Sequence, residues 1–187
     1  MLSNNLDTSP QSWTPQTGPA PIWSAEIWIE NLGMTAHPEG GFYKEVYRSS
    51  DMLSPGQLPE RYPSARSLGT SIFYLLRQGE RSVFHRLISD ELWYYHAGGP
   101  LEIIEITQQG ELISTRLGPN VMAGEVLQHC VPKGRWFGAR PLPETDYSLL
   151  GCVVFPGFDF EDFELADRQA LQDQFPEHQE IILQLTP

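Results

Sequence analysis

The sequence predicts an all-β domain, a sandwich or barrel, with short helices at its two ends. Between residues 41 and 155, short runs of β-branched and aromatic residues alternate with turn signals such as Pro55-Gly56, Gln109-Gly110 and Lys133-Gly134. Helical periodicity is confined to the segments before and after this region. The 187 residues suffice for one compact domain and are too few to require two. We therefore expect a single domain over residues 22–187.

Residues 1–21 are expected to form a disordered or extended N-terminal arm. This segment holds several prolines among Ser, Thr, Gln and Asn and few large apolar side chains that could be buried. A short helix is predicted after it, because Ser24 is a suitable N-cap, Ile27 and Trp28 are apolar, and Gly33 suits the residue that ends a helix. This helix would brace the barrel from outside.

The strands of the barrel are predicted where apolar runs of strand length lie between turn signals. Antiparallel hairpins that close on one another would also leave few exposed sheet edges. The predicted strands are Phe42–Arg48, Thr70–Leu76, Ser82–Ile88, Glu91–His96, Leu101–Thr107, Glu111–Leu117, Val126–Val131, Trp136–Ala139 and Ser148–Phe155.

After Pro156 the apolar pattern becomes helical. Asp162 or Glu164 is expected to open one amphipathic helix, and Pro176 to start a second. Their apolar positions are Leu165, Ala166 and Leu171 in the first helix and Ile181, Ile182 and Leu185 in the second. We expect both helices to pack on the outside of the barrel.

Charge and composition exclude several classes of partner. Asp and Glu number 24 against 12 Lys and Arg, which gives a formal net charge of -12 and disfavours nucleic-acid polymers. No apolar run approaches the roughly 20 residues that span a bilayer, and the polar start of the chain does not resemble a secretory signal. We expect a cytoplasmic protein without a membrane contact. Cys130 and Cys152 lie in apolar surroundings and are expected to be buried thiols, with a disulfide as the alternative.

One stretch combines metal-ligand residue types with regular spacing. Gly79, His85, Glu91 and Gly98 stand at the intervals of the first sequence motif of the cupin superfamily, which the stretch resembles. In that motif a second histidine stands two residues after the first, and this chain has Leu87 there. The motif marks a metal-binding β-barrel, so the sequence indicates such a barrel with one ligand replaced by hydrocarbon.

The second motif of that superfamily is also incomplete. Pro132 and Gly134 match its Pro-x-Gly turn, but Phe137 stands where its histidine belongs. Its leading glycine is displaced to Gly124. The sequence therefore removes a second ligand from the same cavity.

Only His85 and Glu91 remain of the expected ligands. Two protein ligands are too few for a tightly held transition metal, which normally takes three or four. Gln128, His129 or a tyrosine is the alternative source of a further ligand, although neighbours such as Gln128 and His129 cannot both face inward on a regular strand. We predict no bound metal and no other cofactor.

Strand alternation groups the residues around this motif. His85 shares a face with Leu87, and Glu91 shares one with Trp93 and Tyr95 on the next predicted strand. If these faces point inward, they form an aromatic, half-apolar pocket that holds one imidazole and one carboxylate.

His85 and Glu91 are therefore candidate catalytic residues. A histidine in a hydrophobic cavity is suited to take a proton, a nearby carboxylate would orient it, and Tyr43, Tyr47 or Tyr95 would return the proton. The alternative is structural, because a buried His-Glu pair can serve only to satisfy its own hydrogen bonds.

The segment His37–Tyr43 is the second informative stretch. Its adjacent glycines permit a tight entry into the first strand at the mouth of a cavity. Glu39 either closes the pocket or caps the turn, and His37 is expected to belong to the turn. The remaining ligand-binding candidates are the aromatic residues Phe73, Trp93, Trp136 and Phe137, together with Leu87 and Gln128.

Segments in four parts of the chain carry a closer resemblance. They are His37–Ser49, Ser82–Trp93, Gly124–Phe137 and Gly151–Glu161, in this order. Together they resemble the small single-domain cupins of cupin family five, a former domain of unknown function, from about Ile27 to Thr186. Leu87 agrees with the pattern of that family.

The resemblance implies a double-stranded β-helix of the RmlC-like jelly-roll type, with helices packed outside. It also implies a homodimer in which strands or arms are exchanged. The nearest structural comparison is with metal-free sugar-nucleotide epimerases of the superfamily, which use a cavity histidine as base and a tyrosine as acid. The family itself has no settled reaction, and a fold alone does not supply one.

Two hypotheses for the function follow. The first is a metal-independent epimerase or isomerase acting on a sugar nucleotide or related polar ligand, with His85 as base, Glu91 orienting it and Tyr43 or Tyr95 as acid. The second is a non-catalytic binding protein whose aromatic residues stack on a nucleotide or sugar. A metal-dependent oxygenase or isomerase is a third alternative.

Overall fold

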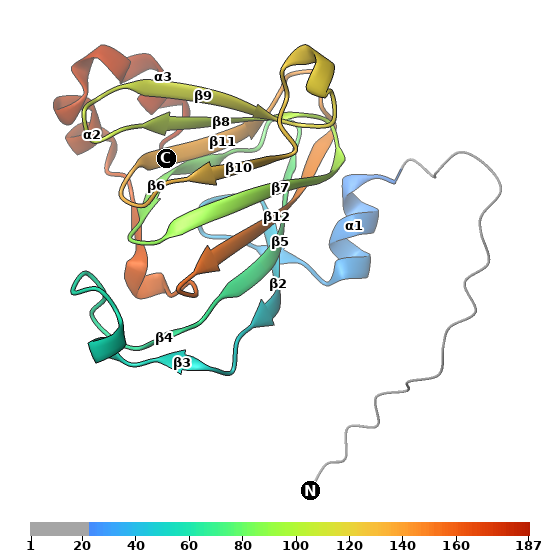
Figure 1. Ribbon diagram of the computed structural model, residues 1–187. Coiled ribbons are helices and arrows are strands. Elements are labelled where there is room, and N and C mark those ends of the chain that lie inside the picture. The colour runs from blue at the N-terminus through green and yellow to red at the C-terminus, as the bar shows by residue number, and fades with distance from the viewer. Residues whose placement is uncertain (1–22) are drawn as a thin grey trace, which may run out of the picture.

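The structure is a computed structural model, and it describes residues 23–187. The predicted arm, residues 1–21, lies outside the described residues. Most strands belong to two sheets that face each other, and every strand pair within these sheets is antiparallel (Figure 1). This architecture confirms the predicted all-β jelly roll.

The larger sheet has six strands in the order β1-β2-β5-β12-β7-β10. In that order they are β1 (Thr35–Ala36), β2 (Phe42–Arg48), β5 (Thr70–Arg77), β12 (Tyr147–Phe155), β7 (Asp90–Gly98) and β10 (Gln128–Val131). β12 lies inside this sheet, where Cys152 pairs with Ile72 of β5 and with Trp93 of β7. β2 and β7, which carries Glu91, thus lie on opposite sides of β12.

The smaller sheet has five strands in the order β13-β6-β11-β8-β9. In that order they are β13 (Phe163–Leu165), β6 (Ser82–Leu87), β11 (Trp136–Pro141), β8 (Leu101–Ile106) and β9 (Leu112–Leu117). Phe137 of β11 pairs with His85 of β6 and with Glu105 of β8. β3 (Met52–Leu53) and β4 (Arg66–Ser67) form a separate two-stranded sheet.

All the predicted strands are present, and most boundaries agree within two residues. The prediction for Val126–Val131 is too long, because the strand begins at Gln128 and Val126 makes only an isolated bridge to Leu117. The two-residue strands β1, β3 and β4 were not predicted. An element this short has no side-chain alternation to detect.

Helix α1 (Ala25–Leu32) matches its prediction. It ends at Gly33, whose φ of 61° is the left-handed conformation that glycine adopts without strain. The helix packs on the outer face of the larger sheet, where Ala25 contacts a cluster that includes Leu75 and Leu149 (Figure 1).

The prediction of a helix that opens at Asp162 or Glu164 is wrong. Phe163–Leu165 forms the edge strand β13, which pairs with β6. Helix α2 (Arg168–Gln174) begins only after Asp167, whose carboxylate accepts a hydrogen bond of 2.8 Å from the backbone N–H of Ala170. Helix α3 (Gln179–Gln184) follows a single turn that starts at Pro176, as predicted.

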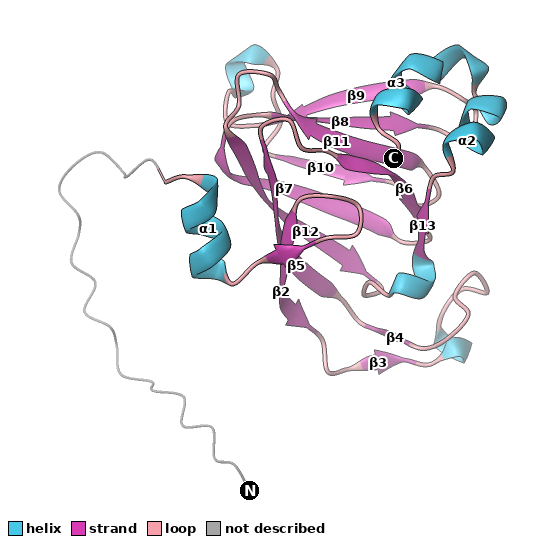
Figure 2. Ribbon diagram, turned by 180° about the vertical axis from the view of Figure 1, so that it is seen from behind, coloured by secondary structure: helices cyan, strands magenta, loops and turns pink. Residues whose placement is uncertain are grey.

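Two apolar layers enclose the smaller sheet. Between the sheets, the core includes Leu101, Ile103 and Leu150. On its outer face, Phe84 and Ile106 pack against the two C-terminal helices, which cover this face of the sheet (Figure 2). Among the described residues, no helix has the length and apolar character needed to cross a bilayer.

Both cysteines are free thiols, so the alternative of a disulfide is wrong. Cys152 is buried, as predicted. Cys130 is exposed, contrary to the prediction, because β10 is the outermost strand of its sheet and no further strand covers this side.

Candidate functional site

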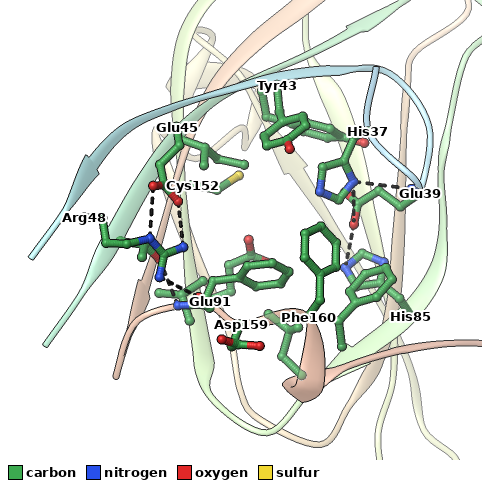
Figure 3. A pocket seen from close by; sticks show the side chains of 17 residues that line it. His37, Glu39, Tyr43, Glu45, Arg48, His85, Glu91, Cys152, Asp159 and Phe160 are labelled. Carbon is green, nitrogen blue, oxygen red and sulfur yellow. Dashed lines mark hydrogen bonds and ion pairs between the residues drawn. The ribbon is translucent and has the colours of Figure 1, made fainter. Parts of the chain in front are cut away.

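A cavity of about 360 Å³ opens between the two sheets (Figure 3). Strands β2, β5, β7 and β12 of the larger sheet form one wall, β6 forms another, and the segment between β12 and β13 closes the remaining side. The lining residues are His37, Glu39, Tyr43, Glu45, Arg48, Thr70, Ile72, Tyr74, His85, Leu87, Glu91, Cys152, Val154, Phe158, Asp159, Phe160 and Phe163.

The turn before β2 delivers His37 and Glu39 to this cavity. Gly40 and Gly41 have backbone φ values of 111° and 68°, which residues with a Cβ atom rarely adopt. A Cβ on Gly40 would also overlap the backbone carbonyl oxygen of Arg81, and one on Gly41 that of Leu75 in β5. The backbone N–H of Val83 donates to the carbonyl oxygen of Glu39 at 2.9 Å, so the turn is tied to β6. The two glycines therefore fix the position of the carboxylate that precedes them.

Glu39 and His85 form the central pair of the site. Oε2 of Glu39 lies 3.2 Å from Nε2 of His85, and both side chains are buried. Nδ1 of His85 lies 2.8 Å from the carbonyl oxygen of Val83, which can only accept, so this nitrogen carries a proton. Nε2 faces the carboxyl group of Glu39, so both ring nitrogens of His85 lie against oxygen atoms of the protein. The Ser82 hydroxyl donates to the other carboxyl oxygen of Glu39 at 3.0 Å.

His37 turns one ring nitrogen towards this pair and the other towards the cavity. The backbone N–H of Glu39 donates to Nδ1 of His37 at 3.3 Å. Burial lowers the pKa of His37, so the ring is neutral near pH 7. A neutral ring that accepts at Nδ1 carries its proton on Nε2, which faces the cavity (Figure 3). His37 thus offers a hydrogen-bond donor to a ligand.

Glu91 is the second carboxyl group of the cavity. It is buried, and its Oε2 atom has no hydrogen-bond partner among the described residues. Burial, together with the nearby charge of Glu39, raises the pKa of Glu91 to about 8. The group is mostly protonated at pH 7 and changes its charge close to neutrality.

The thiol of Cys152 lies in the same wall. Burial and the neighbouring Glu91 raise the pKa of Cys152 well above its usual value. The group therefore remains a thiol, which is a poor nucleophile. It contributes to the lining of the cavity and not to covalent chemistry.

Arg48 and Glu45 form an ion pair at the side of the cavity opposite His37 and His85 (Figure 3). Nε and Nη2 of Arg48 donate to the two carboxyl oxygens of Glu45 at 3.0 and 2.7 Å. Nη1 donates to the carbonyl oxygen of Phe158 at 3.1 Å. Through these contacts Arg48 connects β2 to the segment that closes the cavity.

Five of the predicted site residues line the cavity together. They are His85, Glu91, Tyr43, Glu39 and Leu87. The carboxylate beside His85 is that of Glu39, however, whereas the sequence analysis gave this place to Glu91. His37, which was assigned to a turn, is a cavity residue as well.

The other predicted residues lie elsewhere. Trp93 and Phe137 are buried in the core between the sheets, and the Phe137 ring lies 4.1 Å from the His85 ring, centre to centre. Trp136 lies under the C-terminal helices, and Phe73 packs in the cluster beneath α1. The Tyr95 hydroxyl donates to the carbonyl oxygen of Gly98 at 2.6 Å. Gln128 is exposed on β10.

Sequence reasoning missed the segment from Phe158 to Phe163. Phe158, Asp159, Phe160 and Phe163 line the cavity, although this stretch was interpreted as the approach to a helix. Arg66 holds the segment in place, because its guanidinium donates to both carboxyl oxygens of Asp162 at 2.7 and 2.6 Å. The cluster of phenylalanines at 158, 160 and 163 was an available signal.

The donor set does not fit a transition metal. Of the motif positions, His85 and Glu91 can coordinate, whereas Leu87 and Phe137 present hydrocarbon. Within residues 23–187, no group of three or more His, Cys, Asp or Glu side chains is arranged as a metal shell. Both nitrogens of His85 already face oxygen atoms of the protein.

Comparison with known proteins identifies the family. The family model Cupin_5, described as Cupin superfamily (DUF985), matches residues 26–166. The chain belongs to this family. It is 29% identical over 167 residues to the uncharacterized protein YML079W of Saccharomyces cerevisiae, covering 84% of this chain and 83% of that one.

Solved structures of similar proteins share this fold. Protein SO0799 from Shewanella oneidensis is 43% identical, with a TM-score of 0.78 over 89% of this chain and 99% of that one. A hypothetical protein from Leishmania major is 35% identical, with a TM-score of 0.81 over 87% and 98%. Oxalate decarboxylase from Bacillus subtilis is 16% identical, with a TM-score of 0.50 over 80% of this chain and 36% of that one, and this likeness concerns the cupin fold alone.

Proposed function

We propose that this Cupin_5 protein is an epimerase-type enzyme that moves a proton at the carbon next to a carbonyl group of a small molecule. The observation that carries the proposal is the unpartnered, buried carboxyl oxygen of Glu91 in the same cavity as the neutral His37 ring. A carboxyl group with a pKa near the working pH is an efficient proton acceptor and donor. A neutral imidazole N–H is a suitable partner for a carbonyl oxygen that gains negative charge.

The reaction begins with ionised Glu91. Its carboxylate takes the proton from the carbon, the C–H electron pair forms the double bond of an enolate, and the carbonyl electrons move to the oxygen. The N–H of His37 donates a hydrogen bond to that oxygen and stabilises its charge. Glu91 ends this step as a carboxylic acid.

The return of the proton uses a second face of the ligand. Tyr43 lines the cavity from β2, whereas Glu91 lies on β7, and β5 and β12 separate these two strands in the sheet. The Tyr43 hydroxyl gives its proton to the carbon, the enolate electrons form the new C–H bond, and the proton on Glu91 restores Tyr43 through water. The product is the inverted centre, with no net change in protons.

His85 acts on this chemistry through Glu39. Because neither nitrogen of His85 is free, the geometry favours an orienting role over the role of base that the sequence suggested. The pair fixes Glu39, and the backbone N–H of Glu39 sets the tautomer of His37. No step uses a metal ion, because Leu87 and Phe137 occupy two of the metal-ligand positions of the cupin motifs.

Hydrogen–deuterium exchange tests this assignment. A panel of aldehydes and ketones with a proton next to the carbonyl is incubated with the protein in D₂O and followed by ¹H NMR. We expect Glu91→Gln to slow exchange about 10²–10⁴-fold. Tyr43→Phe should retain exchange but lose inversion. Glu102→Gln, a carboxylate paired with Arg140 outside the cavity, is the matched control and should behave as the wild type.

The pH dependence provides a second criterion. Exchange by the wild type should rise with pH towards about 8, because only the ionised form of Glu91 accepts a proton. The proposal fails if Glu91→Gln exchanges every substrate of the wild type at the wild-type rate.

A binding function without catalysis is the second candidate. The aromatic residues Tyr43, Phe158, Phe160 and Phe163 in one cavity favour it, because such rings supply contact area for a small ligand whether or not a reaction occurs. A ligand that copurifies, binds reversibly and undergoes no exchange in D₂O would support binding over catalysis.

A further inference from the structure

We infer that the ligand of this cavity is an uncharged carbonyl compound, without a phosphate or carboxylate group. The inference rests on the proposed function and specifies its substrate class. It departs from the sugar nucleotide that the sequence resemblance implied, because a sugar nucleotide is an anion. Four features of the cavity support it.

The first feature is the state of Arg48, the one arginine among the described residues that line the cavity. Arg48 is fixed by two hydrogen bonds to Glu45 and one to the carbonyl oxygen of Phe158. Its charge is balanced within the pair, and the edge of the guanidinium that could clamp an anion bidentately is already occupied by Glu45. Within residues 23–187, no lysine lines the cavity.

The second feature is the number of acidic groups around that pair. Glu39, Glu45, Glu91 and Asp159 all line the cavity. The Asp159 carboxyl group receives a hydrogen bond from the backbone N–H of Glu161, and no cation of the described residues lies within hydrogen-bond distance of it. Glu45 is balanced by Arg48 and Glu91 is mostly protonated at pH 7, so Asp159 is the carboxyl group whose repulsion of an anionic ligand no paired cation offsets.

The third feature is the set of donors that the cavity does offer. They are the N–H of His37 and the hydroxyl of Tyr43, which remain donors when Glu91 is ionised for the reaction. A carbonyl oxygen accepts from such donors without bringing a charge into a partly apolar site. Phe158, Phe160 and Phe163 supply the apolar surface for the remainder of the ligand.

The fourth feature acts at longer range. The chain has a formal net charge of -12, so anions are repelled before they reach the mouth of the cavity. Salt weakens this contribution but leaves the local arrangement of Arg48 and Glu45 unchanged.

A matched pair of probes tests the inference. Phenylacetone and phenylpyruvate share a benzyl ketone, and a carboxylate replaces the methyl group in phenylpyruvate. Each is titrated to millimolar concentration into the ¹⁵N-labelled full chain, and the backbone signals of the lining residues are followed by NMR. UDP-glucose is titrated in the same way as the sugar-nucleotide probe, and cyclohexanone as a second uncharged ketone.

We expect phenylacetone to bind at least tenfold more tightly than phenylpyruvate and UDP-glucose to leave the lining signals unchanged. Equal or tighter binding of phenylpyruvate or UDP-glucose in the cavity would overturn the inference. The inference is also overturned if neither phenylacetone nor cyclohexanone shifts a lining residue at these concentrations.

A variant pair tests the cause of the selectivity. Glu45→Gln releases the charge of Arg48 into the cavity, and it should raise the affinity for phenylpyruvate at least fivefold. Glu164→Gln is the matched control, because Glu164 pairs with Arg86 at 2.7 Å outside this cavity, and it should leave the affinity unchanged. If Glu45→Gln binds phenylpyruvate no more tightly than the wild type does, the assignment of selectivity to this ion pair is overturned.

The same measurements separate the inference from the proposed function. Binding of phenylacetone without exchange of its benzylic protons in D₂O supports the ligand class and contradicts the proposed enzyme. Exchange on phenylpyruvate with tighter binding than phenylacetone supports the enzyme and contradicts the ligand class.

Discussion

Oε2 of Glu39 lies 3.2 Å from Nε2 of His85, and this contact joins the turn before β2 to strand β6 inside the barrel. The opposite nitrogen of His85 is held by the carbonyl oxygen of Val83, so the ring has no freedom to turn towards a ligand. Burial makes such a pair sensitive to the loss of either partner, because the remaining polar group would be left buried without its partner.

A double-mutant cycle measures this coupling. We predict that Glu39→Gln and His85→Gln each lower the free energy of unfolding by about 2–4 kcal/mol, with an interaction energy of about 1–3 kcal/mol between them. Urea denaturation followed by circular dichroism provides the four values. Additivity of the two substitutions would show that the pair is not coupled in solution.

Glu91 should make stability depend on pH. Its pKa is about 8 in the folded protein and near 4.5 in the unfolded chain, so the folded state binds the extra proton between these values. The stabilisation is fully present below pH 4.5 and is lost as the pH rises towards 8, by about 1.4 kcal/mol for each pH unit.

Glu91→Gln removes this ionisation while retaining the size of the side chain. We predict that the variant is more stable than the wild type at pH 8 and that its pH profile is flatter between 4.5 and 8. Thermal unfolding across this range supplies the measurement, with Glu164→Gln as the exposed control. A profile parallel to that of the wild type would contradict the raised pKa.

The two thiols should differ in reactivity. Partial burial raises the pKa of Cys130, and full burial raises the pKa of Cys152 further, but only Cys130 is exposed to a reagent in solution. We predict that Ellman's reagent modifies one thiol in the native wild type and none in the Cys130→Ser variant within the same period. After denaturation, Cys130→Ser should release the signal of one thiol. Rapid reaction of native Cys130→Ser would show that reagents enter the cavity and find an ionised Cys152.

Sequence periodicity predicted the barrel because its strands are long enough to show alternation. The same alternation brought His85, Leu87 and Glu91 to one cavity. It did not identify which carboxylate meets His85, because Glu39 reaches it from a turn that is distant in sequence. Alternation also does not show which face of a strand points to the other sheet when both faces are apolar.

Trp136 illustrates this second difficulty. It lies on β11 next to Phe137, and both are large and apolar. Phe137 faces the other sheet, whereas Trp136 faces the C-terminal helices. Sequence alone could not show that the outer face of this sheet is covered and therefore apolar. The wall from Phe158 to Phe163 was missed for a related reason, since pairing with β6 overrides the local helical pattern at Phe163.

The buried contact between Arg66 and Asp162 should hold that wall in place. The two side chains are 1% and 3% exposed and form two hydrogen bonds, which connect β4 to the segment that presents Phe160 and Phe163 to the cavity. We predict that Arg66→Met lowers the free energy of unfolding by about 3–5 kcal/mol, because the Asp162 charge loses its partner in a buried setting.

Arg86→Met is the matched control for this substitution. Arg86 pairs with Glu164 at 2.7 Å, but the two side chains are 41% and 55% exposed, so the expected loss is below about 1 kcal/mol. Some of that loss would come from the contact of Arg86 with the ring of Trp136. Urea denaturation compares the two variants, and the ¹H–¹⁵N spectrum shows whether the signals of Phe160 and Phe163 move in Arg66→Met alone. If the two variants lose the same free energy of unfolding, burial does not make the Arg66–Asp162 pair more important for stability than the exposed Arg86–Glu164 pair.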